Sequence, residues 1–189
     1  MIEDDFYPPG SLAGRAMHAL RRPETFPGRP SWKDVRVAVR IFRYVGTERD
    51  DPMGSQTGPL GTYTAWVVGR RGDAYVVRRL FWDPTPERNV TDPGLSLAQA
   101  DLAAADFGRR LDQLHALRLP PFVPEPSGAL HGTTHGLEYG SFHSGSSFHW
   151  FQAAHAEWSA LGAWWTAAVE MIESALVSAG HPRAPERVG

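Results

Sequence analysis

The sequence contains no cysteine. This absence excludes a disulfide scaffold, a cysteine-based zinc site and a thiol nucleophile. No stretch of the sequence approaches the roughly 18 consecutive apolar residues that a membrane-spanning helix needs. The acidic start, Met1–Asp5, lacks the apolar run of a signal peptide. We therefore expect a cytoplasmic protein that has no membrane partner.

Sequence signatures of common catalytic sites are also missing. No glycine-rich phosphate loop of the Walker A type or of the dinucleotide-binding type occurs. No serine has the Gly-x-Ser-x-Gly surroundings of a nucleophile elbow. We therefore interpret the serines of the C-terminal half that cluster between two predicted strands as turn residues. They are Ser141, Ser144, Ser146 and Ser147.

Charge is nearly balanced over the chain but uneven along it. The net charge is −2 at pH 7 and the pI is about 6.4, which argues against non-specific binding to nucleic acid. Residues 1–82 carry 13 basic and 9 acidic groups, whereas residues 83–189 carry 6 and 12. The two halves either pair with each other in the fold or present a basic face to an acidic partner.

Length and composition fit one globular domain. The chain has 189 residues, of which 42% are hydrophobic and 21% are charged, close to the averages of folded domains. Prolines punctuate the first thirty or so residues, and Gly180 and Pro182 end the last apolar periodic segment. We predict an irregular N-terminal arm over residues 1–31, a single domain over residues 32–180 and a flexible tail over residues 181–189.

Alternation of apolar and polar residues predicts strands in the first half of the chain. The predicted strands are residues 34–45, 62–70 and 74–82. In the first strand, the odd-numbered residues from Val35 to Ile41 would share one buried face. The short turn at Arg71–Asp73 makes the second and third strands an antiparallel hairpin. The third strand is apolar on both faces, which indicates cover on both faces or an interface.

Helical periodicity appears in the second half. Ser96 and Gln99 have the spacing of a capping box, and apolar residues recur at helical spacing from Leu97 to Leu114. We therefore predict a helix that begins at Ser96 and ends before Pro120. Two strands and a last helix follow, over residues 136–142, 146–151 and 157–179. The order β-β-β-α-β-β-α predicts an α+β fold, with a mostly antiparallel sheet of about five strands and helices packed on it.

Five of the eight histidines fall within 25 residues, from His131 to His155. One hypothesis is a small hydrolase or nuclease in which His143 and His149 form an acid-base pair beside Glu138. Another is a Zn²⁺ site, with candidate ligands His131, His135 and His143. The plainer interpretation is a solvent-facing hairpin with scattered polar side chains and no cofactor.

Arginine and tryptophan side chains predict a binding surface on the first three strands. If several of these residues share a face, they would form a patch suited to carboxylates or to a protein partner. The predicted binding residues are Arg36, Arg40, Trp66, Arg78 and Trp82. An ordinary solvated sheet face with internal ion pairs is the alternative.

Part of the C-terminal half resembles a known layout. The segments concerned are His131–Glu138, Ser146–Trp150 and Trp158–Leu161. Together they resemble small uncharacterised bacterial α+β proteins in which a D-G-T-type strand, a serine-rich turn, a strand ending in tryptophan and a W-x-x-L helix follow one another. The resemblance covers about residues 130–165 and implies no activity. It implies structural roles for Gly132, Trp150 and Trp158.

The leading functional hypothesis is a non-enzymatic protein-binding module. It rests on the compact α+β pattern, the missing catalytic signatures and the predicted arginine–tryptophan surface. The expected partner is another protein, such as a toxin that the chain neutralises in the manner of an immunity protein. Seven tryptophans and nine phenylalanines also make a homodimer an option.

Overall fold

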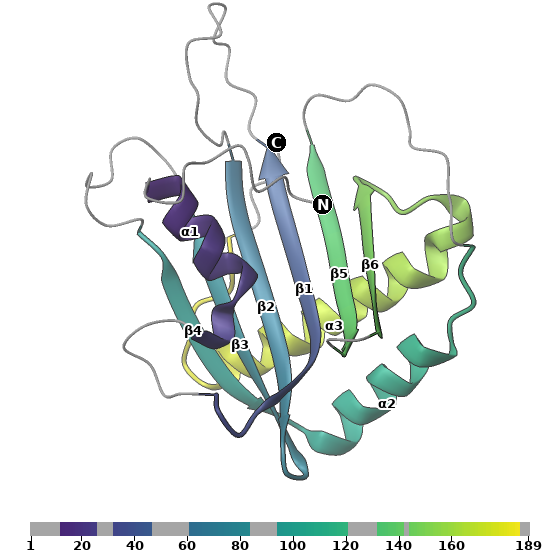
Figure 1. The fold of residues 1–189 in the computed structure, drawn as a ribbon, viewed down its shortest axis with the longest axis horizontal. Coiled ribbons are helices and arrows are strands. Elements are labelled where there is room, and N and C mark those ends of the chain that lie inside the picture. Colours follow the sequence, from purple (N-terminus) through teal and green to yellow (C-terminus); the bar gives the residue numbers. More distant parts are fainter. Residues whose placement is uncertain are drawn as a thin grey trace, which may run out of the picture.

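The protein is one antiparallel sheet with helices on both faces (Figure 1). The computed structural model describes residues 12–25, 32–46, 61–83, 94–120, 132–141 and 144–185. The six strands have the spatial order β4-β3-β2-β1-β5-β6. The predicted α+β class is confirmed, with six strands where about five were expected.

The described elements have the following bounds. The strands are β1 (Arg36–Gly46), β2 (Gly61–Arg71), β3 (Ala74–Trp82), β4 (Ser96–Leu102), β5 (Thr133–Ser141) and β6 (Ser144–Phe151). The helices are α1 (Leu12–Arg21), α2 (Ala104–Ala116) and α3 (Ser159–Ser178), with short 3₁₀ turns η2 (Pro23–Thr25) and η3 (Ala156–Trp158). No helix among these described residues is both long and apolar enough to cross a lipid bilayer.

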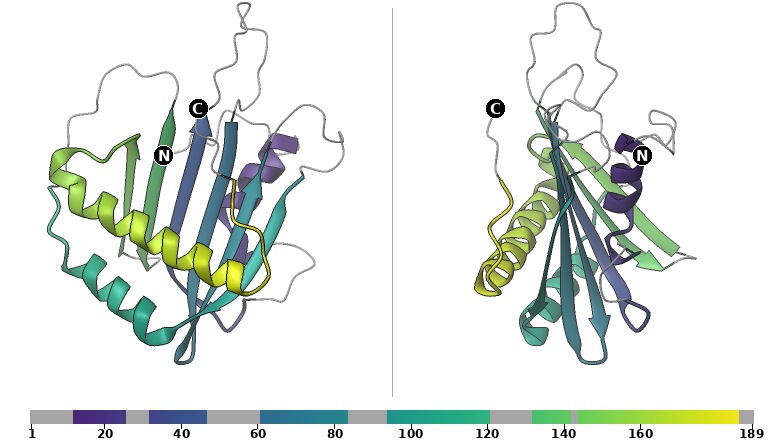
Figure 2. Two further views of the ribbon diagram at one scale, coloured as in Figure 1. Left: turned by 180° about the vertical axis from the view of Figure 1, so that it is seen from behind. Right: turned by 90° about the vertical axis from the view of Figure 1, so that its left-hand side faces the viewer.

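Helices α2 and α3 cover one face of the sheet and form the main core with it (Figure 2). Helix α3 crosses the strands, and its apolar side packs on residues that alternate along β1 and β2. The central buried side chains of this core are Val39, Ile41, Trp66, Val68, Phe107, Leu161, Ile172 and Leu176. Burial of these large side chains supplies most of the driving force for this packing.

A buried ion pair joins α3 to the sheet. The Arg79 side chain donates to Glu173 Oε2 over 2.6 Å, and Trp66 Nε1–H donates to Glu173 Oε1 over 2.6 Å. Arg79 also donates to the carbonyl oxygen of Pro182, and the amide of Ala184 donates to Glu173 Oε2. Both oxygens of Glu173 and both terminal nitrogens of Arg79 therefore have partners, which a buried charge requires, whereas Arg79 Nε has none. Residues 182 and 184, inside the predicted tail, are held against the sheet by these bonds.

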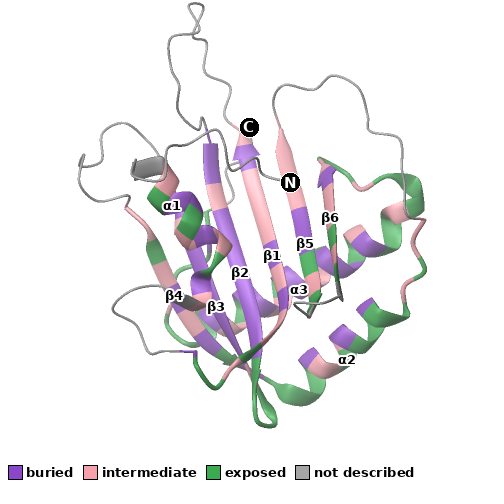
Figure 3. Cartoon of the chain, viewed as in Figure 1, coloured by how far each residue is buried: buried purple, intermediate pink, exposed green. Residues whose placement is uncertain are grey.

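The opposite face of the sheet is covered over only half its width. Helix α1 buries Met17 and Leu20 against β2 and β3, and Trp32 packs on Val67 and Val76. Helix α1 lies within residues 1–31, which were predicted as an irregular arm. Figure 3 shows β2 and β3 mostly buried, whereas β1 and β5 alternate between buried and partly exposed residues. Within the part of the chain that the structure describes, no helix covers the second face of β1, β5 and β6.

The predicted helix from Ser96 is wrong over its first half. Residues 96–102 form strand β4, which pairs with β3 from Tyr75 to Phe81. Ala98, Ala100 and Leu102 alternate on the face toward α3, and this period-two pattern is hidden within the helical one. Pairing with β3 overrides the capping-box signal, because the edge of β3 would otherwise leave its backbone groups unpaired. Only from Ala104 does the helix α2 begin.

The predicted single buried face of the first strand is also wrong. The register of β1 against β2 shifts between Val37 and Val39, which marks a β-bulge. Val35 and Val37 therefore pack with Trp32 on one face, whereas Val39 and Ile41 pack under α3 on the other. The bulge directs the following even-numbered side chains of β1 to the open half of the second face.

Candidate functional site

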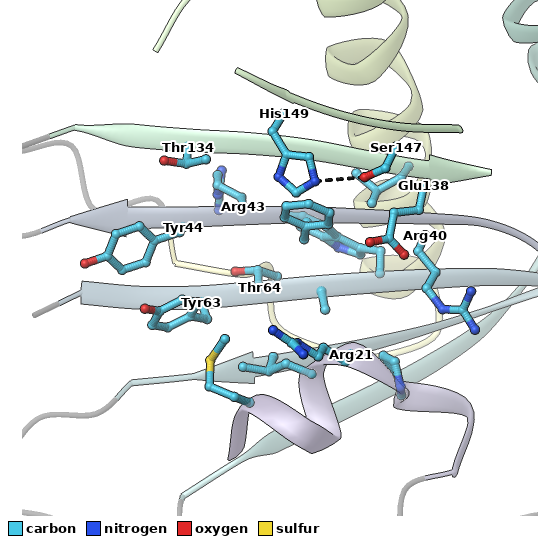
Figure 4. A pocket seen from close by; sticks show the side chains of 17 residues that line it. Arg21, Arg40, Arg43, Tyr44, Tyr63, Thr64, Thr134, Glu138, Ser147 and His149 are labelled. Carbon is cyan, nitrogen blue, oxygen red and sulfur yellow. Dashed lines mark hydrogen bonds between the residues drawn. The ribbon is translucent and has the colours of Figure 1, made fainter. Parts of the chain in front are cut away.

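A groove of about 650 Å³ occupies the open half of the second sheet face. The end of α1 forms one wall, with Met17, Leu20 and Arg21. Strands β1 and β2 form the floor, and β5 and β6 form the other wall (Figure 4). The two ends differ in chemistry: Tyr44 and Tyr63 lie at one end, and the charged side chains lie at the other.

The floor is aromatic because glycines on neighbouring strands make room for rings. A Cβ on Gly136 would lie 1.8 Å from the Phe42 ring, so this ring lies directly against the β5 backbone. A Cβ on Gly61 would likewise meet the Tyr44 ring at 2.5 Å. Rings over glycines restore the packing that a strand glycine loses. The outer ends of both rings therefore lie against the glycine backbones of β5 and β2.

The aromatic end of the groove continues toward α1. Tyr44 stacks on Tyr63 with ring centroids 4.4 Å apart, and Tyr63 stacks on Trp82 at 5.5 Å. Burial raises the pKa of the Tyr44 hydroxyl, and a hydrogen bond with Tyr63 partly offsets this rise. The stack offers a rigid apolar surface that carries polar hydroxyl groups, a combination enriched at binding surfaces.

The polar end of the groove carries charged and hydroxyl groups from β1, β5 and β6. Arg40 on β1 donates to Glu24 of η2 over 2.6 Å. Glu138 on β5 is paired in register with Ser147 on β6. The Ser147 Oγ lies 2.8 Å from His149 Nε2 (Figure 4).

His149 lies between the polar end and the aromatic floor. Its ring is 4.9 Å from the Phe42 ring, and burial lowers the pKa of the imidazole. The ring is therefore neutral at pH 7 and can accept or donate one hydrogen bond. Of the predicted catalytic residues, the structure brings His149 and Glu138 to the same groove, whereas His143 lies outside the described residues.

The predicted arginine–tryptophan surface is divided between two faces and is largely buried. Trp66 is 1% exposed and packs under α3, and Trp82 is 3% exposed beneath α1. Arg78 is 0% exposed and contacts η2. Arg36 is exposed at the start of β1. Arg40 and Trp66 both line the groove, although the Trp66 side chain packs in the main core. These five residues therefore do not form one exposed patch.

Arg78 joins the N-terminal arm to the sheet. Its guanidinium donates to Gln99 Oε1 over 2.9 and 3.1 Å and to the carbonyl oxygens of Pro23 and Glu24 over 3.1 and 3.2 Å. The guanidinium carbon also lies 4.8 Å from the centre of the Trp32 ring, within the range of a cation–π contact. The arginine predicted for binding a partner thus binds the chain itself.

His135 faces the main core, away from the groove. Its ring stacks on Trp150 at 5.7 Å and meets the edge of Trp165 at 4.6 Å. Burial, together with the nearby charge of Arg43, lowers the pKa of His135 to about 4. The ring is neutral at pH 7 and Nδ1 has no hydrogen-bond partner.

A metal site at the predicted histidines stays untested, since His131 and His143 lie outside the described residues. Among the residues that the structure does describe, no three His, Asp or Glu side chains converge on one point. His135, the remaining candidate ligand, lies on the sheet face opposite His149 and Glu138.

The residues with inferred structural roles lie in packed positions. Gly132 has a φ of 147° and its backbone approaches the Phe151 ring, so that a Cβ would lie 2.4 Å from that ring. Trp150 is buried in the main core, and Trp158 Nε1–H donates to the carbonyl oxygen of Pro120. All three residues hold the C-terminal hairpin and the start of α3 in place.

Sequence reasoning missed the residues that form the groove. Phe42, Tyr44 and Tyr63 were not predicted for binding, and Ser147 was interpreted as a turn residue. A signal was present in β1, because Arg40, Phe42 and Tyr44 alternate as one amphipathic row. The bulge that turns this row toward the open face has no sequence signature of its own.

Comparisons of the chain with protein-family models, with curated proteins and with solved structures found no match.

Proposed function

We propose that the chain is a non-enzymatic protein-binding module and that the groove is its binding surface. The immunity-type role, in which the chain neutralises a toxin, is the form of this function that we favour. The observation that carries the proposal is the half-open sheet face, with its aromatic floor of Phe42, Tyr44 and Tyr63.

The composition of the groove supports a protein partner. Interfaces are enriched in aromatic residues and arginine, and their energetic centres are aromatic anchors surrounded by polar groups. Here an aromatic floor adjoins Arg40, Glu138 and His149 at one end. The other face of the sheet is filled by α2 and α3, so that the groove can be occupied without disturbing the main core.

Affinity measurements on groove variants test this proposal. Phe42→Ala and Tyr63→Ala remove rings from the floor, and each is expected to weaken binding of a captured partner about 30-fold, as for a hot-spot residue. Partners would be captured from the native host and their affinity measured by calorimetry. Val177→Ala is the control, because Val177 is 49% exposed on α3. Equal affinities for all four proteins would refute the proposal.

A second candidate function is a small hydrolase that uses His149 as general base. The specific observation is the 2.8 Å contact between Ser147 Oγ and His149 Nε2, beside Glu138. A neutral imidazole in contact with a hydroxyl is the arrangement that activates a serine. If this candidate holds, Ser147→Ala and His149→Ala will each abolish turnover of an activated ester such as p-nitrophenyl acetate. Turnover equal to that of the unaltered protein in either variant would exclude it.

A further inference from the structure

Strand β6 is an edge of the sheet, and the direction of its backbone groups can be derived. The amide of Gln152 donates to the carbonyl oxygen of Thr133 over 2.6 Å, so residue 152 faces β5. Backbone groups alternate in direction along an antiparallel strand. In the observed register, residues 144, 146, 148 and 150 therefore also face β5.

The alternate residues of β6 direct their N–H and C=O groups away from the sheet. These residues are Gly145, Ser147, His149 and Phe151. A second hydrogen bond leads to the same assignment. The Gly46 amide donates to the carbonyl oxygen of Gly132, so the backbone groups of the even-numbered residues of β5 face β1 and those of the odd-numbered residues face β6. Within the described residues, no backbone hydrogen bond to these outward groups is recorded.

The two edges of the sheet differ in protection. At the β4 edge, His181 Nε2 lies 3.4 Å from the amide nitrogen and 3.0 Å from the carbonyl oxygen of Gln99. Asp101 adds an exposed negative charge to β4. By contrast, β6 (Ser144–Phe151) has no proline and no Lys, Arg, Asp or Glu. Natural sheets use such charges, prolines and covers to prevent strand pairing, so β6 is the edge open to it.

The helix layer extends past β6. Figures 1 and 2 show the start of α3 beyond the last strand, on the face away from the groove. There the Trp158 ring meets the partly buried Phe148 ring edge-on at 5.5 Å. A further strand beside β6 would therefore have apolar cover on one face and the end of the groove, at Ser147 and His149, on the other.

We propose that β6 binds an extended segment of a protein partner as a seventh strand of the sheet. The segment pairs its backbone with the outward groups of Ser147 and His149. Its side chains alternate, with apolar ones toward Phe148 and Trp158, and polar ones toward Ser147 and His149. The proposal rests on the proposed protein-binding function, because the added strand continues the wall of the groove.

A second copy of the chain fits this edge less well. Pairing of β6 with β6 of another copy would bring the protruding starts of both α3 helices to the same face of the joined sheet (Figure 2). A single extended segment meets no such obstacle. Strand addition to an open edge is a common mode of peptide recognition, in which backbone bonds give affinity and alternate side chains give specificity.

Proline at an outward position of β6 tests this inference without breaking the sheet. The N–H of Ser147 faces away from β5, so Ser147→Pro removes a donor that only an added strand would use. Ser147→Ala is the matched control, since it loses the hydroxyl and keeps the N–H. Thermal melting of both variants checks that the fold is retained.

The probe is a phage-displayed library of random linear peptides, selected on the unaltered protein. We expect enriched peptides with alternating apolar and polar residues, whose affinity is at least about tenfold lower for Ser147→Pro than for Ser147→Ala. Such a peptide would be N-methylated either at its odd-numbered or at its even-numbered backbone amides. Methylation of the amides that face β6 should abolish binding, and methylation of the other set should not.

The outcomes separate this inference from the proposed function. Peptides that bind Ser147→Pro unchanged but lose affinity on Phe42→Ala would overturn strand addition and leave the groove as the binding surface. Peptides unaffected by both variants, or a failure to enrich any peptide, would overturn both. Sedimentation that shows a dimer in the unaltered protein and a monomer in Ser147→Pro would instead identify the occupant as a second copy and overturn the partner-segment proposal.

Discussion

Glu173→Ala is expected to lower the free energy of unfolding by about 3–5 kcal/mol, the usual result of removing one member of a buried ion pair. The substitution leaves the Arg79 guanidinium buried with the carbonyl of Pro182 as its one remaining recorded acceptor. It also leaves Trp66 Nε1–H and the amide of Ala184 without the acceptor they share. The cost arises from these uncompensated polar groups more than from the lost attraction.

Urea unfolding measures this effect, and the same helix supplies the control. Glu170 pairs with Arg183 at the exposed surface, so Glu170→Ala should change stability by less than about 1 kcal/mol. Replacing both Arg79 and Glu173 with methionine should recover most of the loss, because no buried charge remains. A loss below about 1 kcal/mol in Glu173→Ala would show that the pair is not buried as described.

Arg78→Met should release the N-terminal arm from the sheet and cost about 3 kcal/mol. Methionine keeps the apolar stem but removes every guanidinium donor to Gln99, Pro23 and Glu24. The contact with the Trp32 ring is lost as well. Helix α1 is joined to this region through η2, so that its docking should weaken together with the arm.

Limited trypsin digestion reads out this release directly. In Arg78→Met we expect faster cleavage after Arg15 and Arg21 than in the unaltered protein, at the same temperature. Arg40→Met is the comparison, because it removes a single, partly exposed bond to Glu24 and should cost about 1 kcal/mol or less. Faster cleavage of Arg40→Met than of Arg78→Met would contradict the assignment of Arg78 as the residue that mainly holds the N-terminal arm on the sheet.

Much of the fold could be predicted from local patterns. The hairpin of β2 and β3 followed from the tight turn at Gly72, where a φ of 58° suits glycine. The last helix followed from its regular apolar spacing, and the structure places it at Ser159–Ser178. Both elements have sequence signals that tertiary contacts reinforce, which is the condition under which local reasoning succeeds.

The misassigned elements depend on partners far away in the chain. Residues 96–102 read equally well as a helix start, and they form a strand because β3 offers an edge to pair with. The bulge in β1 likewise depends on pairing with β2. Local sequence patterns carry little information on whether such a segment forms a helix or a strand, or on where a bulge occurs. The free energy that favours one structure over the other comes from contacts between residues far apart in the sequence.

The burial of Trp66 and Arg78 was not predicted, for a related reason. Tryptophan and arginine are amphipathic, so Trp66 and Arg78 suit either an interface or a buried hydrogen-bonded position. Trp66 is buried because it donates to Glu173 on α3, and Arg78 is buried because it donates to Gln99 on β4. The alternation pattern of the strands does not reveal either partner. His149 was named as a candidate acid-base residue, which stays a prediction, and its neighbours across the sheet became visible only in the fold.

Photo-crosslinking tests the central claim, that the groove binds a protein, most directly. p-Benzoylphenylalanine would replace Tyr44 at the groove in one protein and Val177 on the outer surface of α3 in another. The account predicts a crosslink to one protein species from position 44 and none from position 177. Crosslinking from position 177 alone, or from neither position in the presence of the captured partner, would contradict it.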